Sequence, residues 1–156
     1  MSEKNSTQGY CFTATFNSIS RVLHNEVELE SAINPCVKLK IKALWDTGAT
    51  NSVIRPELAA KLELQPVGKV LINTPSGKDV PSNVYFVNLY LPNHVAIPKI
   101  PVLEGIPNNC DMLIGMDVIK LGDFAVSNYN GKTTFSFRMP SMAMIDFVKH
   151  SYLIPI

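Results

Sequence analysis

Asp46, Thr47 and Gly48 are the residues of this chain whose types and spacing point most clearly to chemistry. They directly follow the run "KIKALW", which has the pattern of a strand that ends in the protein core. Asp and Gly are common in turns, and a Thr hydroxyl can bond within a loop, so the triplet can be a structural turn. A carboxylate at the end of a buried strand can also take part in hydrolysis if a second carboxylate lies beside it.

Two neighbouring carboxylates can hydrolyse a peptide bond without a metal ion or a covalent intermediate. Like charges about 3 Å apart cannot both ionise, so the pair shares one proton. One carboxylate then takes a proton from water while the other protonates the carbonyl oxygen. The chain contains a single Asp-Thr-Gly, so such a site requires Asp46 from two copies of the chain that meet at a two-fold axis.

Length and composition favour one globular domain. The chain has 156 residues, of which 46% are hydrophobic and 17% charged. No stretch approaches the roughly 20 apolar residues of a membrane-spanning helix, so no membrane partner is expected. The first ten residues are polar and predict no secretory signal, which makes a cytoplasmic location the simplest interpretation.

Charge and ligand patterns argue against several classes of partner. The net charge is +1 and the basic residues are scattered, which argues against nucleic acid. The three cysteines are widely spaced and match neither a disulfide framework nor a zinc pattern, and the three histidines show no ligand spacing. We therefore expect no metal ion and no cofactor. The residues concerned are Cys11, Cys36, Cys110, His24, His94 and His150.

The elements that must position Asp46 are mostly strands. Period-two patterns recur throughout the chain, whereas helical periodicity is confined to two short segments, 55–64 and 116–121. A strand at 10–16 is expected to form a hairpin with 20–30 through Asn17 and Ser18. Further strands are predicted at 36–45, 68–74, 80–91, 94–104 and 112–114, and a hairpin at 123–137 that turns at Asn130-Gly131.

The order of these motifs resembles that of the retropepsins, the single-domain aspartic proteases. Asp46-Thr47-Gly48-Ala49 follows an apolar strand, a hairpin with Gly77 at its tip comes next, and the apolar pair and glycine of "LIG" precede a helix. The resemblance extends from about Val37 to Phe137. It implies a mostly β, closed β-barrel with one or two short helices that acts as a homodimer. The expected division is an N-terminal extension at 1–35, the protease domain at 36–139 and an apolar C-terminal tail at 140–156.

The resemblance also implies roles for individual residues. Asp46 would be the catalytic carboxylate, Thr47 would bond to the partner's loop, and Gly48 would let the backbone approach and offer its N–H to the carboxylate. Ala49 suggests a mildly acidic optimum. The hairpin at 74–80 would close over an extended peptide substrate. The residues expected to contact substrate are Ala49, Val53, Ile54, Ile72, Pro75, Ser76, Gly77, Lys78, Val80 and Ile114.

The sequence departs from the retroviral pattern in three places. The segment before Cys36 is longer than a minimal retropepsin needs, and its strand at 10–16 suggests an added edge or a dimer contact. Met116 stands where an arginine usually follows the glycine, and Asp117 is expected to serve the helix dipole or a cap and not catalysis. The apolar tail after Pro140 can join the dimer, fold back on its own subunit or lie in the cleft. Two alternatives to an active protease stay open, namely a catalytically weak or inactive peptide-binding module and a structural β domain whose Asp-Thr-Gly is a turn.

Overall fold

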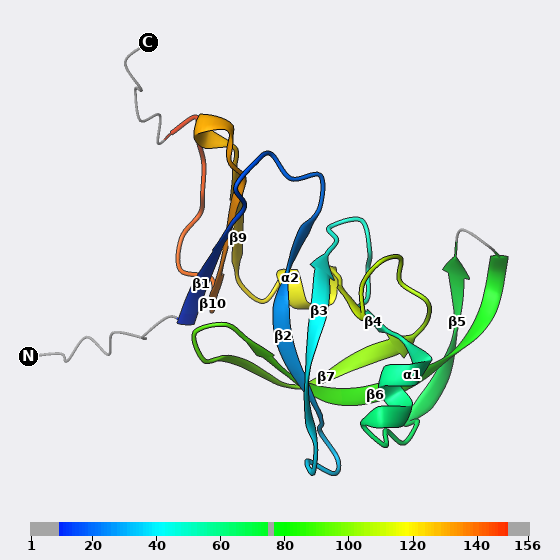
Figure 1. Cartoon of the computed structure of the whole chain (residues 1–156). Helices are drawn as coiled ribbons and strands as arrows, with labels where there is room; N and C mark the ends of the chain where they lie inside the picture. The colour runs from blue at the N-terminus through cyan, green and yellow to red at the C-terminus, as the bar shows by residue number, and fades with distance from the viewer. Residues whose placement is uncertain (1–9, 75–76, 150–156) are drawn as a thin grey trace, which may run out of the picture.

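A closed barrel of six strands forms the body of the protein in the computed structural model, which describes residues 10–74 and 77–149 (Figure 1). Neighbouring strands are antiparallel except for the parallel pairs β3–β8 and β4–β7, and β6 closes the barrel by pairing with β2. In barrel order the strands are β2 (Leu23–Ser31), β3 (Lys38–Trp45), β8 (Met112–Ile114), β4 (Val53–Ile54), β7 (Val95–Glu104) and β6 (Gly77–Leu91). The predicted mostly β, closed barrel is confirmed.

Strand β3 shows why the sequence forms this barrel. Ile41, Ala43 and Trp45 alternate along the strand and are buried in the core. The lysines of β3 pair with glutamates of β2, and the Lys40 Nζ lies 2.6 Å from Glu26 Oε2, diagonally across the two strands. This exposed ladder adds little to stability, because ion pairs in water contribute at most about 1 kcal/mol each. The apolar face therefore determines the register that places Asp46 at the strand end.

Two short helices and a seventh strand, β5, accompany the six-stranded barrel. The predicted helix at 55–64 is found as α1 (Pro56–Lys61), which starts with a proline in its first turn and buries Leu58 and Ala59. Helix α2 (Met116–Ile119) follows Gly115 and buries Val118 and Ile119. Strand β5 (Gly68–Thr74) pairs with β6 alone, so β5 and β6 form a hairpin that extends from the barrel (Figure 1).

A separate three-stranded sheet stands on the other side of the barrel in the view of Figure 1. It consists of β1 (Tyr10–Thr15), β10 (Thr134–Met139) and β9 (Asp123–Ser127), in the order β1-β10-β9. The predicted hairpin at 123–137 is confirmed, and both turn residues have positive φ angles, 51° at Asn130 and 72° at Gly131.

The predicted pairing of β1 with the next strand is wrong. Strand β1 pairs with β10, whereas β2 pairs with β3 and β6. The aromatic side chains explain this choice, because Phe12 of β1 packs against Trp45 and against the buried Phe135 and Phe137 of β10. On the opposite face of this pair Thr13 and Ser136 are hydrogen-bonded at 2.8 Å.

Strand β2 lies within residues 1–35, the segment expected to be an N-terminal extension, yet it forms part of the barrel wall. We therefore propose that the protease domain begins before residue 36 and includes β2. The last described segment follows β10 and exposes a run of large apolar side chains. They are Met142, Met144, Ile145, Phe147 and Val148.

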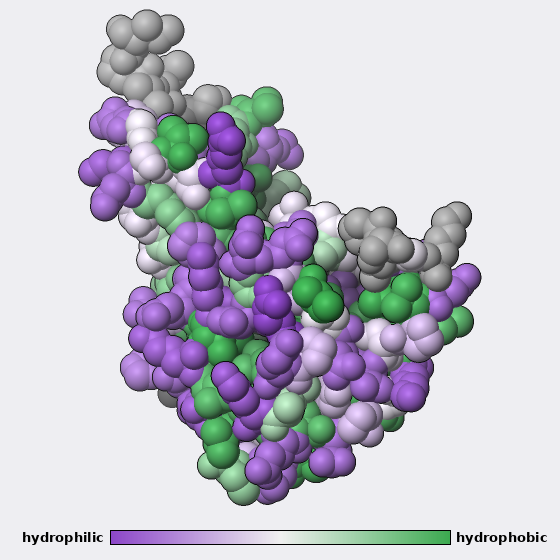
Figure 2. Space-filling view, turned by 45° about the vertical axis from the view of Figure 1, so that its right-hand side comes forward, coloured by the Kyte–Doolittle hydropathy of each residue, from purple (hydrophilic) through white to green (hydrophobic). Residues whose placement is uncertain are grey.

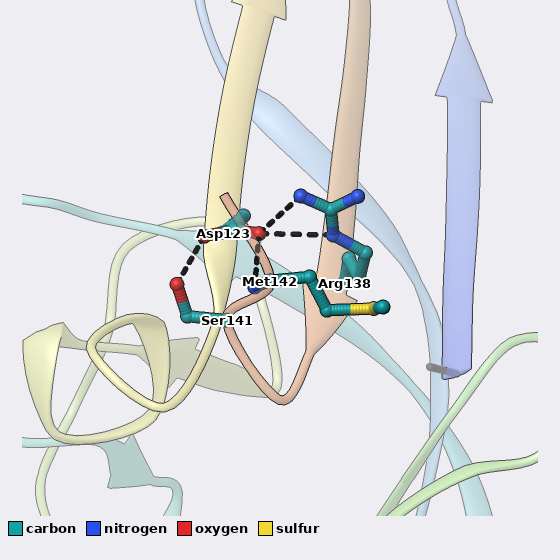
Figure 3. Close-up of polar contacts among 4 residues, drawn as sticks. All are labelled: Asp123, Arg138, Ser141 and Met142. Atoms are coloured by element: carbon teal, nitrogen blue, oxygen red, sulfur yellow. Dashed lines mark hydrogen bonds and ion pairs between the residues drawn. The ribbon is translucent and has the colours of Figure 1, made fainter. Parts of the chain in front are cut away.

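Asp123, at the start of β9, holds the beginning of this segment against the sheet (Figure 3). Its carboxylate accepts hydrogen bonds from the Met142 N–H, the Ser141 hydroxyl and the Arg138 guanidinium, which also forms an ion pair with it. The backbone N–H of Met142, followed by the Ser141 hydroxyl, holds the pKa of Asp123 well below its ordinary value.

We expect Asp123→Asn to lower the free energy of unfolding at neutral pH by about 2 kcal/mol, because hydrogen bonds to a charged group are lost. The folded-state pKa is depressed, so this contribution is complete above the ordinary pKa of an Asp and is lost as the pH falls through the folded-state value. Urea unfolding of both proteins from neutral to strongly acidic pH measures it. A constant difference between them across that range would contradict the assignment.

Hydrophilic and smaller hydrophobic areas alternate over the face of the barrel in Figure 2. Hydrophobic surface is visible on the side of the molecule that carries the β5–β6 hairpin. Three apolar residues of this hairpin, Val70, Leu71 and Val80, are exposed. Across the described residues, no helix has the length and apolar character needed to span a membrane.

Candidate active site

The carboxyl ends of β3 and β8 lie side by side and place Asp46 next to the "LIG" segment. The two strands are parallel, with Trp45 opposite Ile114. The pairing extends one residue further, because the Asp46 N–H donates to the Ile114 carbonyl at 2.9 Å. Two segments almost seventy residues apart in sequence, each with the pattern quoted for the resemblance, thus meet at one edge of the barrel.

The turn after β3 aims its backbone at the Asp46 carboxylate. The Gly48 N–H donates to Asp46 Oδ1 at 2.8 Å. A Cβ atom at Gly48 would lie 3.1 Å from the same oxygen, so glycine keeps this close approach free of strain. Within the described chain, Asp46 Oδ2 and the Thr47 hydroxyl have no hydrogen-bond partner, and Thr47 and Gly48 are exposed. Residues 46–52, which we call the catalytic loop after the role expected of Asp46, therefore present polar groups that have no protein partner in the described chain.

The second half of the catalytic loop is bonded to the corner between β8 and α2. The Met116 N–H donates to the Ala49 carbonyl at 2.8 Å and the Asp117 N–H to the Thr50 carbonyl at 3.1 Å. The Asp117 carboxylate accepts from both the backbone and the hydroxyl of Ser52. Asp117 lies in the first turn of α2, where a negative charge interacts favourably with the helix dipole, as expected. Its hydrogen bonds to Ser52 were not expected from the sequence.

A pocket of about 390 Å³ adjoins Asp46. Its walls are largely apolar, and one cation, Arg21, contributes to them. In the described part of the chain Arg21 has no ion-pair partner. The lining residues are Arg21, Val22, Leu23, Leu44, Trp45, Asp46, Thr47 and Phe124. A larger pocket, about 490 Å³, lies at α1 and includes no residue of the catalytic loop.

The residues expected to bind substrate do not all lie on one face. Ile54 and Ile114 are fully buried in the barrel core. Val53 is half-buried and pairs directly with the half-buried Leu113 across β4 and β8, so these two face away from the core together. Leu113 was not among the residues expected at this surface, because a short all-apolar strand does not reveal which of its faces is buried.

The hairpin residues lie on the β5–β6 arm. Ile72 is half-buried, Val80 is 38% exposed and pairs with it across the hairpin, and Gly77 pairs with Thr74. Ala49 is half-buried in the catalytic loop. Pro75 and Ser76 lie outside the described residues, and of Lys78 only the backbone is described, as part of β6.

The fold and this arrangement agree with a family comparison. The family model described as "Aspartyl protease" matches residues 31–118, more than half of the chain. The chain belongs to the aspartyl protease family. The match begins in β2 and ends in α2, so it contains the catalytic loop and the segment that supports it. A comparison with curated proteins finds no match.

Solved structures of proteases and of a protease-like domain resemble this family member. A retropepsin-like aspartic protease from Rickettsia conorii is 16% identical, with a TM-score of 0.54 over 85% of this chain and 96% of that chain. EIAV protease complexed with the inhibitor HBY-793 is 20% identical, with a TM-score of 0.46 over 68% and 91% of the two chains. The retroviral protease-like domain of Ddi1 from Leishmania major is 18% identical, with a TM-score of 0.43 over 74% and 95%. The fold is retropepsin-like.

Proposed function

We propose that this aspartyl protease family member is an active endopeptidase that works as a homodimer. The observation that carries the proposal is the state of Asp46. Its Oδ1 is fixed by the Gly48 N–H, its Oδ2 has no partner in the described chain, and it borders a pocket. A carboxylate held in this way can share a proton with a second carboxylate and activate water.

The second carboxylate would come from another copy of the chain, because only one Asp-Thr-Gly is present. The exposed Thr47 hydroxyl is available to bond across such an interface. Strand β9 is an edge strand, and its Phe124 stacks on Trp45 with ring centroids 5.5 Å apart and borders the Asp46 pocket. Pairing of β9 with its symmetry mate would therefore bring the two catalytic loops together.

The substrate would be an extended peptide that lies between the catalytic loop and the β5–β6 hairpin. Val53, Leu113, Ile72 and Val80 offer apolar surface for its side chains. No cofactor takes part in this reaction. We propose that it occurs in the cytoplasm, since the described cysteines are all free thiols, as is usual in a reducing compartment.

Cleavage of a diverse peptide library by the purified chain tests the proposal. We expect turnover between about pH 4 and 7, since a carboxylate pair sharing one proton works in mildly acidic solution. A statine-type transition-state analogue should abolish it. Cleavage that is insensitive to the analogue would indicate a contaminating enzyme, and no cleavage by a folded dimer would contradict the proposed function.

Specific activity is expected to fall on dilution, because a site shared by two subunits exists only in the associated state. The dimer population, measured by analytical ultracentrifugation, should fall over the same concentration range as the activity. Activity per chain that stays constant while the dimer dissociates would show that one chain suffices.

A further inference from the structure

A buried cluster of hydrogen bonds lies directly behind the catalytic loop. Ser52 is fully buried, and its N–H and its hydroxyl donate to Asp117 Oδ2 and Oδ1 at 2.9 and 2.8 Å. The hydroxyl oxygen of Ser52 in turn accepts a hydrogen bond from the Gly115 N–H at 3.1 Å. One serine thus joins the end of the catalytic loop to both the glycine of "LIG" and the acid of α2.

Asp117 has no cationic partner in the part of the chain that the structure describes. Its charge is stabilised by donors instead, since Oδ1 also accepts the Val118 N–H at 3.0 Å. The backbone of the same residue donates to the Thr50 carbonyl. Asp117 therefore holds the loop at two points, Thr50 and Ser52.

We propose that Asp117 is a positioning residue for the proposed reaction and acts on Asp46 through Ser52 and the catalytic loop; this inference rests on the proposed function. Met116, the residue before Asp117, has no charged group, and its side chain is partly exposed. The Asp117 carboxylate supplies the side-chain attachment of the loop to α2. Catalytic groups must be held within about 0.5 Å of their working positions, and a loop bonded by backbone groups alone provides less restraint.

Three variants separate this role from a general effect on folding. Asp117→Asn keeps the shape of the side chain but places an NH₂ group against donors, and Ser52→Ala removes the hydroxyl that bridges Asp117 and Gly115. The double variant measures their coupling. The matched control is Asp111→Asn, because Asp111 also accepts a backbone N–H, that of Lys42 at 2.9 Å, but lies at the end of β8 remote from Asp46.

We expect kcat to fall about 10- to 100-fold in each single variant while KM changes less than about 3-fold, because displacement of the reacting group affects the chemical step. The double variant should lose no more than the worse single variant, since both changes break the same network. Amide hydrogen exchange at Ser52 and Gly115 should accelerate at least tenfold in Asp117→Asn. In Asp111→Asn neither kcat nor this exchange should change.

Unchanged kcat in folded, dimeric Asp117→Asn would overturn the proposal, as would multiplicative losses in the double variant. If Asp117→Asn does not fold, Ser52→Ala decides by the same criteria, because it leaves the carboxylate in place. A wild-type chain without activity would refute the proposed function, and the positioning role with it. The exchange data would then show separately whether Asp117 restrains the loop.

Discussion

Asp46→Asn should reduce peptide cleavage by about 10³-fold or more, equivalent to a loss of about 4 kcal/mol of transition-state stabilisation. The amide has nearly the shape of the carboxylate, and its oxygen can still accept the Gly48 N–H that now bonds to Oδ1 at 2.8 Å. It can neither take a proton from water nor share one with the partner's aspartate. The fold and the dimer should therefore survive while kcat is lost.

The loss is measured as kcat/KM at an enzyme concentration above that at which the dimer dissociates. The control is Asp111→Asn, which makes the same chemical change just before β8, at the end of that strand away from Asp46. It should retain wild-type activity. Binding of a substrate-like peptide by Asp46→Asn should stay within a few-fold of the wild-type value. Turnover by Asp46→Asn within tenfold of the wild type would exclude the carboxylate as a reacting group.

Gly115→Ala should be the most damaging small change near the site. An added Cβ would lie 2.7 and 2.8 Å from the backbone carbon and oxygen of Asn51 and 2.9 Å from the Ala49 oxygen. All three are main-chain atoms of the catalytic loop and cannot rotate away. We expect a loss of about 2–4 kcal/mol in the free energy of unfolding and at least a tenfold loss of activity at temperatures where the variant remains folded.

Gly68→Ala is the matched control, because nothing lies within 4 Å of a Cβ at that position at the start of β5. Its free energy of unfolding should stay within about 0.5 kcal/mol of the wild type. Urea unfolding, together with kcat for both variants, makes the comparison. Equal stabilities for the two glycine variants would mean that the loop can move away from α2, contrary to the tight contact described above.

The sequence predicted the position of Asp46 well because the signal there is local. An alternating strand, a turn triplet and an apolar pair before glycine are each visible within a few residues, and the parallel pairing of β3 with β8 brings them together. The short helix after Pro56 and the hairpin at Asn130-Gly131 were predictable for the same reason.

Features that depend on distant pairing were not predictable. Strand β1 reaches β10 across more than a hundred residues, selected by aromatic packing that no local pattern reveals. Arg21 borders the Asp46 pocket because Leu23 pairs with Trp45 at the start of β2, a register that the sequence of either strand alone does not determine. In the sequence Asp117 looks like any acidic residue in the first turn of a helix. Its hydrogen bonds to Ser52, which is distant in the sequence, appear only in the folded structure.

The central claim, that two chains build one active site, is tested most directly by mixing subunits. Wild-type and Asp46→Asn chains are dissociated together, reassociated in equal amounts at constant total concentration, and assayed for peptide cleavage. Random pairing leaves about one quarter of the dimers with two aspartates, and the mixed dimers, with one, should be inactive. Activity should therefore be about one quarter of that of wild-type protein at the same total concentration. A value near one half would mean that each chain carries a complete site, which would contradict the account.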